Sequence, residues 1–452
     1  MQLTFLGATG TVTGSRYLLS VGSKEVLIDC GLFQGYKELR LRNWEKFPVD
    51  PCNIDAVVLT HAHIDHTGYL PLLVKKGYAG PIYSTPATKD LCSILLPDSG
   101  YLQEEEARLA NKYGYSKHKP ALPLYTKEDG LNVLKQFHTV DYDTQYPLFE
   151  QLSFRFFRAG HILGSSFIEF KKENTSILFT GDIGRSADPV MRERSKIQST
   201  DYLVIESTYG DRLHATQNPQ KQLGELINQT AKRGGSVIIP AFAVGRAQSL
   251  LFYISQLKSA GTIPDLPVFL DSPMATNVTD ILCKYKNEHR LTEQQCMQLC
   301  DVAEYVNTPD ESKKLDTYRM PIIIISASGM ATGGRILHHL KVFLQDPLST
   351  IILTGYQAGG TRGARIANGE KEIKIHGQMI PVRAHVESLS NLSAHADYQD
   401  ILDWLSKFTK PPRKVFITHG EPKAALALKT KIEEALGFTC EVPQYLATEE
   451  LT

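Results

Sequence analysis

Residues 56–66, Ala-Val-Val-Leu-Thr-His-Ala-His-Ile-Asp-His, decide the fold of this chain. A short apolar strand runs directly into three imidazoles and one carboxylate. In extended backbone His61 and His63 point the same way, because side chains repeat every two residues. Asp65 and His66 begin the helix that follows and face a neighbouring point. One loop thus offers two adjacent sets of nitrogen and oxygen donors, which suit Zn²⁺ and related first-row ions.

Further metal-competent residues occur at the ends of other predicted strands. They are Asp29 after 26–28, His161 after 154–159, Asp182 after 177–180, Glu206 at the end of 203–205 and His419 after 415–418. Any one of them could be an ordinary turn residue. Functional side chains gather on the loops at one edge of a sheet, so five in the same context favour a shared site.

The order of predicted strands and helices changes twice along the chain and divides it into three stretches. Residues 1–209 read mostly as short strands, which is typical of two sheets packed on each other. Residues 210–371 alternate strands with long helices, the pattern of a parallel sheet covered by helices. Short strands return in 372–452. The sequence therefore predicts an α/β protein in which 210–371 form a second domain inserted into the first.

Composition restricts the class of protein. Of 452 residues, 42% are hydrophobic and 22% charged, and 49 basic residues balance 49 acidic ones. No global positive field attracts nucleic acid, so an RNA site would have to be local. The 7 cysteines are sparse and none lie in a CxxC spacing, which favours a reducing cytoplasm. The apolar runs are too short to span a membrane, and the N-terminus lacks a signal-peptide pattern.

The metal motif and three later motifs together resemble a known family. His-Ala-His-Ile-Asp-His (61–66), with Asp29, His161, Asp182 and His419, resembles the metallo-β-lactamase fold. Glu206 in ESTYGD, His395 in SAHAD and His419 in THGE resemble motifs A, B and C of the β-CASP nucleases. The nearest branch resembles the cleavage-and-polyadenylation endonucleases and their bacterial homologues. The resemblance implies an αββα metallo-β-lactamase sandwich with an inserted βα (β-CASP) domain carrying a mainly parallel sheet.

The resemblance also assigns roles to these residues. His61, His63 and His161 would hold one zinc ion, and Asp65, His66 and His419 a second, with Asp182 bridging them. Asp29 would hydrogen-bond a ligand imidazole and fix its orientation. His395 would protonate the leaving oxygen and Glu206 would orient it, so that His395, Glu206, Asp182 and Asp65 form the catalytic group. The expected reaction is endonucleolytic hydrolysis of single-stranded RNA by a two-metal-activated hydroxide, leaving a 5′-phosphate and a 3′-hydroxyl.

Small-residue turns of the inserted domain are predicted to contact RNA. Backbone N–H groups in such turns can approach a phosphate where a helix begins. The residues singled out are Arg246, Ser328, Gly329, Arg335, Arg362 and Arg365. Tight packing of helix on strand is the alternative explanation for each turn. His338 and His339 are interpreted as surface residues.

Other functions remain open at this point. A 5′-to-3′ exoribonuclease of the ribonuclease J type would carry a further C-terminal domain, and this chain ends soon after His419. A thioesterase or lactonase would use the same metal scaffold without the β-CASP motifs. A non-enzymatic RNA-binding subunit would have no need of the full ligand set. The resemblance also allows a homodimer and protein partners that supply specificity.

Overall fold

The computed structural model describes residues 1–149 and 151–452, which form two compact units. The first contains Met1–Leu213 and His395–Thr452, and the second His214–Ala394. The predicted fold class is confirmed. The first expected domain boundary, at 209/210, lies close to the start of the second unit. The other, at 371/372, falls before the end of that unit.

The first unit contains two seven-stranded sheets. One has the order β22-β1-β2-β3-β4-β5-β6, antiparallel up to β3 and parallel from β3 to β6. Its strands are β1 Gln2–Phe5, β2 Tyr17–Val21, β3 Lys24–Ile28, β4 Ala56–Val58, β5 Ile82–Ser84, β6 Phe137–Thr139 and β22 Thr448–Glu450.

The other sheet has the order β21-β20-β11-β10-β9-β8-β7. Its strands are β7 Tyr146–Phe149, β8 Leu152–Arg158, β9 Ser166–Lys172, β10 Thr175–Phe179, β11 Tyr202–Glu206, β20 Lys414–Thr418 and β21 Cys440–Glu441. The strands from β10 to β21 pair in parallel, so β10, β11 and β20 end at the same edge. That edge carries the metal-competent residues.

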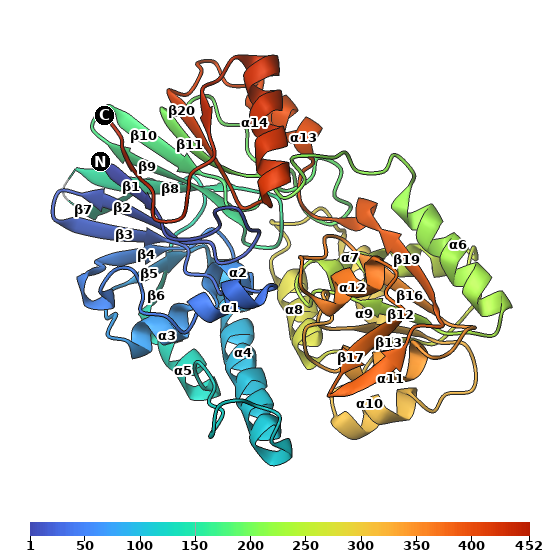
Figure 1. Ribbon diagram of the computed structural model, residues 1–452. Helices are drawn as coiled ribbons and strands as arrows, with labels where there is room; N and C mark the ends of the chain where they lie inside the picture. The colour runs from blue at the N-terminus through green and yellow to red at the C-terminus, as the bar shows by residue number, and fades with distance from the viewer. Residues whose placement is uncertain (150) are drawn as a thin grey trace. The chain divides into compact units, whose positions relative to one another are not determined.

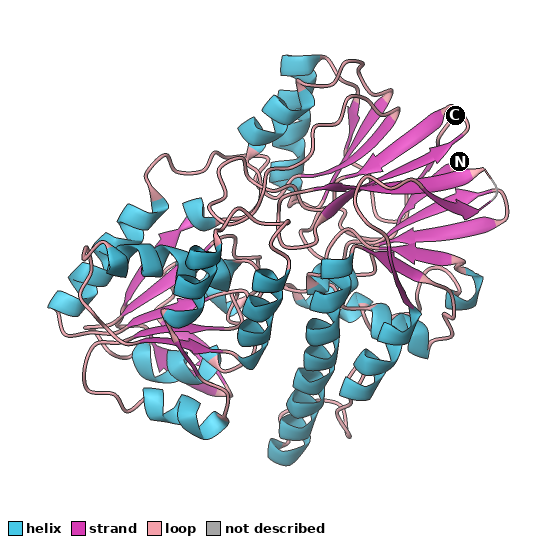
Figure 2. Cartoon of the chain, turned by 180° about the vertical axis from the view of Figure 1, so that it is seen from behind, coloured by secondary structure: helices cyan, strands magenta, loops and turns pink. Residues whose placement is uncertain are grey.

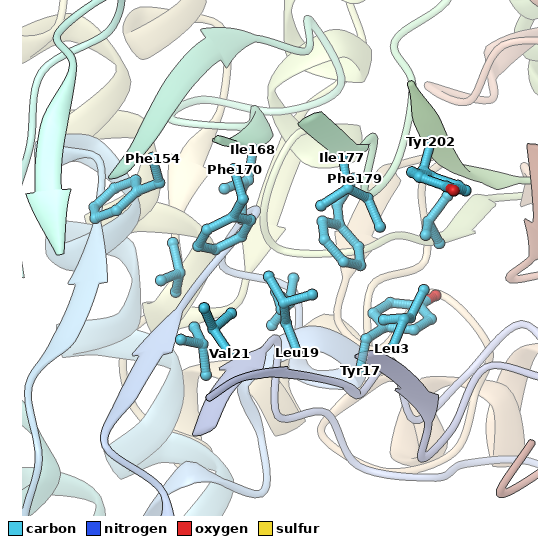
Figure 3. Packing of buried hydrophobic residues seen from close by; sticks show 14 of the residues in the cluster. Leu3, Tyr17, Leu19, Val21, Phe154, Ile168, Phe170, Ile177, Phe179 and Tyr202 are labelled. Atoms are coloured by element: carbon cyan, nitrogen blue, oxygen red, sulfur yellow. The ribbon is translucent and has the colours of Figure 1, made fainter. Parts of the chain in front are cut away.

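The core of this unit lies between the two sheets. Figure 3 shows Phe154, Phe170 and Phe179 from one sheet facing Leu19 and Val21 from the other. All five are nearly or fully buried. Alternation along each strand decides which side chains point into this layer, because successive side chains lie on opposite faces.

Helices cover the outer face of the sheet that contains β20. They are α13 Tyr398–Leu405 and α14 Pro422–Leu436, and both lie beside β11 and β20 in Figure 1. Trp404 and Leu428 pack there on Phe167 and Ile417. Phe167 precedes Ile168, which faces the inner core, so one strand serves two hydrophobic layers.

The remaining helices of the first unit follow the strands of the other sheet. They are α1 Lys37–Arg42, η1 Pro51–Asn53, α2 Ile64–Thr67, α3 Leu70–Lys75, α4 Pro86–Tyr113, α5 Lys127–Asn132 and η2 Val133–Gln136. The long helix α4 is capped at its N-terminus by Thr85, whose hydroxyl accepts a hydrogen bond from the Thr88 N–H, and has proline at its first position. It ends at Gly114 in the left-handed conformation, φ 65°.

The second unit is built on a six-stranded sheet in which every described pair is parallel. Its order is β14-β13-β15-β12-β16-β19, with β12 Val237–Pro240, β13 Val268–Asp271, β14 Glu304–Tyr305, β15 Ile323–Ser326, β16 Thr350–Thr354 and β19 His385–Leu389. Strand β19 pairs with β16, and this pairing places residues 372–394 in the second unit rather than the first.

Helices flank both sides of this sheet, as Figure 2 shows. They are α6 Pro219–Lys232, α7 Arg246–Ser259, α8 Pro273–Lys284, α9 Glu293–Asp301, α10 Pro309–Leu315, α11 Ile336–Phe343 and α12 Arg362–Ala367. A hairpin of β17 Glu372–Ile375 and β18 Gln378–Pro381 and the short helix η3 Ser390–Leu392 complete the unit. In neither unit does a described helix have the length and apolarity needed to cross a membrane.

Candidate metal centre

The first predicted donor set comes together at the ends of strands from both sheets of the first unit. His61 and His63 follow β4, His161 lies in the turn after β8, and Asp182 follows β10. His61 Nε2 lies 3.0 Å from His63 Nδ1. His161 Nε2 lies 3.3 Å from His63 Nδ1 and 3.3 Å from Asp182 Oδ2. His61 Nε2 lies 3.4 Å from the same Asp182 oxygen.

These separations fit a tetrahedral metal ion. Zinc bonds nitrogen and oxygen at about 2.0–2.1 Å, so the edges of its tetrahedron measure about 3.3 Å. Four donor atoms at that spacing, three imidazole nitrogens and one carboxylate oxygen, match the hard-to-borderline ligands that zinc takes. The first set therefore fits a zinc ion by both chemistry and spacing.

The second predicted donor set lies directly beside the first. His66 Nε2 lies 3.2 Å from His419 Nε2, and His419 Nε2 lies 3.4 Å from Asp65 Oδ2. Asp65 and His66 come from the start of α2, whereas His419 follows β20. The second set thus joins residues that are more than 350 positions apart in the chain.

Asp182 faces both sets with different oxygens. Its Oδ2 approaches His61 and His161, while its Oδ1 lies 3.3 Å from His66 Nε2 and 3.5 Å from His419 Nδ1. Oδ1 is buried and accepts no hydrogen bond within the described residues. A buried carboxylate oxygen without a donor is costly unless a cation or proton satisfies it. This geometry suits a carboxylate shared by two metal ions.

Asp29 lies where it can orient His66. Its Oδ2 lies 2.7 Å from His66 Nδ1, and the Thr60 N–H and hydroxyl each donate to its carboxylate at 2.8 Å. A proton held on Nδ1 by Asp29 leaves the Nε2 lone pair directed at the second set. Asp29 adopts φ 56°, a left-handed conformation that aspartate tolerates better than most residues.

His419 also occupies the left-handed region, with φ 47°. Its backbone N–H donates to Ala8 O at 2.7 Å, and its Nδ1 lies 3.3 Å from the Thr208 hydroxyl. The next residue is Gly420, where a Cβ atom would lie 2.1 Å from Ser207 Oγ. Strained backbone of this kind persists where surrounding contacts fix it, and it is common at functional sites.

Burial keeps the imidazoles of the first set neutral. It lowers the pKa of His61, lowers that of His161 well below 6.5, and, together with the neighbouring His61, lowers that of His63 to about 3. Neutral imidazole is the form that binds a metal ion.

Around Asp182, the neighbouring charges outweigh the effect of burial on the pKa. Burial alone would raise its pKa, but His419, His66 and His61 hold the pKa well below its ordinary value. Burial likewise disfavours the charged form of His66, yet the carboxylates of Asp182 and Asp29 raise the pKa of His66 well above 6.5. The site therefore keeps the Asp182 carboxylate ionised.

A histidine–glutamate pair lies against the first set. His395 Nδ1 lies 3.0 Å and 3.2 Å from the two oxygens of Glu206, and 3.9 Å from Asp182 Oδ2. Glu206 is held by the Ile183 N–H, and Ala396 N donates to Ile183 O. Burial lowers the pKa of His395, but Glu206 and Asp182 outweigh it and raise the pKa to about 9.

Sequence reasoning missed the polar residues that hold these candidate ligands in place. Thr60 hydrogen-bonds Asp29 and lies 3.1 Å from His61 Nδ1. The Ser165 hydroxyl accepts the backbone N–H of His161 at 3.0 Å and so closes the turn that carries this ligand. The one signal for Thr60 in the sequence was its position, since it immediately precedes His61, the first predicted ligand.

Most of the predicted RNA contacts of the inserted domain have partners within their own unit. Arg335 bonds Asp271 at 2.6 Å and the carbonyl groups of Val306 and Asn307. Arg365 pairs with Glu370.

The other arginines and the small residues lie in the turns that were expected. Arg362 donates to the carbonyl groups of Lys374 and Thr332, and Arg246 is buried at the start of α7. The Ser328 hydroxyl accepts the Thr332 N–H. Gly329 packs against Phe242, because a Cβ there would lie 2.7 Å from the ring. RNA contact by Arg246, Ser328, Gly329, Arg335, Arg362 and Arg365 stays a prediction.

Comparison with family models agrees with this architecture. Residues 9–96 match the metallo-beta-lactamase superfamily, 247–366 the Beta-Casp domain, and 379–443 the Zn-dependent metallo-hydrolase RNA specificity domain. The last match spans the end of the second unit and the return to the first.

Relatives match the chain along nearly its whole length. Ribonuclease TTHA0252 of Thermus thermophilus is 36% identical and covers 95% of both chains. An RNase J-like protein of Methanocaldococcus jannaschii is 33% identical over 98% of this chain and 97% of its own. The transcription termination factor FttA of Methanosarcina mazei is 32% identical over this whole chain and 72% of its own. The chain therefore belongs to the β-CASP family of metallo-β-lactamase-fold ribonucleases, which are metal-dependent hydrolases.

A solved structure of a protein of unknown function from Enterococcus faecalis shares the fold. It aligns with a TM-score of 0.54 at 13% identity and covers 99% of each chain.

Proposed function

We propose that this chain is a two-zinc endoribonuclease that hydrolyses phosphodiester bonds of single-stranded RNA and leaves a 5′-phosphate and a 3′-hydroxyl. The observation that carries the proposal is the division of Asp182 between two donor sets, one oxygen to each, with His395 3.9 Å from the same carboxylate. Two ions held by these sets would lower the pKa of an attacking water and neutralise charge on the phosphate.

The protein's own groups supply the remaining requirements. Glu206 holds His395 through Nδ1, so Nε2 is the ring nitrogen left to carry a proton to the departing ribose 3′-oxygen. Proton transfer from a positioned histidine contributes roughly 10²–10⁴-fold. Burial of Asp182 and of His61, His66 and His161 keeps water from competing for the donor atoms.

Two other activities compete with this proposal. The Methanocaldococcus relative is named RNase J-like, which supports a 5′-to-3′ exoribonuclease as the second candidate. A thioesterase or lactonase is disfavoured by the match to an RNA specificity domain. We place the protein in the cytoplasm on its cysteine usage, and on the family resemblance we propose a homodimer and protein partners that supply specificity.

The test is digestion of a single-stranded RNA labelled at the 5′ end in one sample and internally in another. Wild type, His395→Ala and Glu206→Gln are compared with added zinc and with a chelator, and zinc content is measured for each protein. His138→Ala serves as control, because His138 is exposed on β6.

Discrete internal fragments, lost in His395→Ala while both zinc ions remain, would support the proposal. We expect Glu206→Gln to retain part of the activity, because the amide still accepts a hydrogen bond from His395. Immediate release of a labelled 5′ mononucleotide would replace the proposal with an exonuclease. Intact RNA in every lane, with two zinc ions bound, would refute it.

A further inference from the structure

The long helix α4 connects the metal centre to a distant part of the first unit. At its start, the hydroxyl groups of Thr85 and Thr88 donate to Gly164 O, in the turn that carries His161. Its 28 residues span about 42 Å at 1.5 Å per residue. Figures 1 and 2 both show the helix extending away from the strands of its own unit, with its C-terminal end farthest from them.

That end is basic and aromatic. We call residues 112–119, Lys-Tyr-Gly-Tyr-Ser-Lys-His-Lys, the α4 tip. Tyr113 and Tyr115 are 67% and 61% exposed, and Lys112, Lys117 and Lys119 are also exposed. The tip itself contains three lysines and no acidic residue, in a chain whose net charge is zero. The acidic run Glu104–Glu106 lies further back along α4, where Glu105 pairs with Arg108. At this exposure the two tyrosine rings bury little surface in the unit that displays them.

The tip is held in place by hydrogen bonds at its base. The Asn111 side chain accepts the Ala121 N–H at 2.7 Å and donates to Ala121 O at 2.9 Å, which closes the loop. Beyond it the chain returns along α4, where Leu124 N donates to the Gln103 side chain and Tyr125 bonds Ser99. A loop closed in this way presents its side chains with less ordering cost on binding.

We propose that the α4 tip is a second contact site for single-stranded RNA, separate from the bond being cleaved. This inference rests on the proposed ribonuclease function. Every base has a π-face, so exposed tyrosines can stack on RNA of any sequence. Three lysines interleaved with them neutralise backbone phosphates. Partial burial and, to a smaller extent, the charge of Glu106 raise the pKa of the Tyr115 hydroxyl. The three lysines outnumber this carboxylate.

The distance between the tip and the metal centre makes the proposal testable by RNA length. An RNA long enough to follow α4 engages both sites, whereas a short oligonucleotide at the metal centre reaches only one. The contribution of the tip should therefore appear in the KM for long RNA and be absent from kcat and from the kinetics of short RNA.

The test compares the full chain with its Tyr113→Ala/Tyr115→Ala double variant. Stacking contributes about 1–3 kcal/mol per base, so affinity for long RNA should fall at least about fivefold. Tyr113→Phe/Tyr115→Phe should restore it, because the rings stack without their hydroxyl groups. Affinity is measured in the His395→Ala background, so that binding can be followed without cleavage.

The lysines give an independent readout. Changing Lys112, Lys117 and Lys119 to Gln should reduce the salt slope of binding by about 2, because each phosphate that is no longer neutralised removes about 0.7 from the slope. Lys410→Gln is the matched control, an exposed lysine of the same unit.

Wild-type affinity for long RNA in the double alanine variant, with an unchanged salt slope in the lysine variant, would overturn the proposal. Loss of self-association in sedimentation, with RNA affinity unchanged, would do so as well and would assign the tip to a second copy of the chain. If the wild type cleaves no RNA but binds long RNA through the tip, the proposed function fails while RNA binding by the tip is retained, so the two failures are distinguishable.

Discussion

Replacing Asp29 by asparagine should weaken one of the two proposed metal sites and leave the affinity of the other unchanged. The carboxylate of Asp29 accepts from His66 Nδ1 at 2.7 Å and from Thr60 N and Oγ1 at 2.8 Å each. Asparagine has the same shape and tolerates the left-handed backbone at φ 56°, so the loop itself should persist. The change therefore isolates the hydrogen bond and its charge.

The expected loss of metal affinity follows from the atom that the asparagine amide presents to His66. If the amide oxygen in Asp29→Asn keeps the bond to Thr60 N, the amide N–H₂ turns toward His66 Nδ1. His66 Nδ1 must then accept, which moves the ring proton to Nε2, the atom that faces His419 and Asp182. Loss of such an orienting partner costs roughly 10–100-fold in metal affinity, about 1.4–2.7 kcal/mol.

Competition between the protein and a chromophoric chelator for zinc measures this loss of affinity directly. Wild type should compete through two sites, and Asp29→Asn through one site of unchanged affinity and one weakened site. Asp50→Asn is the control, because Asp50 caps a short helix at an exposed position where asparagine caps equally well. Two unweakened sites in Asp29→Asn would refute the reasoning that His66 is oriented by this carboxylate.

Three further changes test other parts of the fold. Gly31→Ala should prevent assembly of the second donor set, since its Cβ would lie 1.5 Å from Asp65 O, and the zinc content of the purified protein measures the loss. Phe170→Ala should lower the free energy of unfolding by about 3–5 kcal/mol in urea, because the ring is fully buried between the sheets. His339 should make stability depend on pH: burial lowers its pKa, but bonds to Asp271 and a second carboxylate raise it to about 9. This stabilisation is present below about pH 6.5 and lost as the pH rises through 9, by up to about 3 kcal/mol, and His339→Gln should remove the slope in unfolding curves recorded across that range.

The donor loop could be predicted from sequence because it is local. A strand followed by alternating histidines fixes the directions of His61 and His63 without knowledge of the rest of the chain. The more distant candidate ligands were predicted from a shared context instead, each at the end of a strand. Parallel pairing of β10, β11 and β20 is what brings Asp182, Glu206 and His419 to one edge.

Pairings between distant segments could not be predicted in the same way. Strand β19 has an exposed, polar sequence, and only its pairing with β16 assigns residues 372–394 to the second unit. His339 was interpreted as a surface residue, and this was wrong. The residue is fully buried, with Nε2 2.7 Å from Asp271. Asp271 lies 68 positions away at the end of strand β13, whereas His339 is in helix α11, so no local pattern revealed the contact.

Metal binding should also stabilise the sandwich as a whole, because the donors come from both of its sheets. His61 and His66 follow a strand of one sheet, whereas His161, Asp182 and His419 follow strands of the other. A ligand present at 100 times its Kd stabilises the folded state by about 2.7 kcal/mol per site, so chelation should lower the Tm by several degrees. Calorimetry with and without chelator measures the shift, and Asp29→Asn should show a smaller one than wild type. An unchanged Tm after complete removal of zinc would mean that the core shown in Figure 3 alone holds the buried donors together. The tetrahedral spacing would then be a property of the packing, and the metal would fill a site that the two sheets build without it.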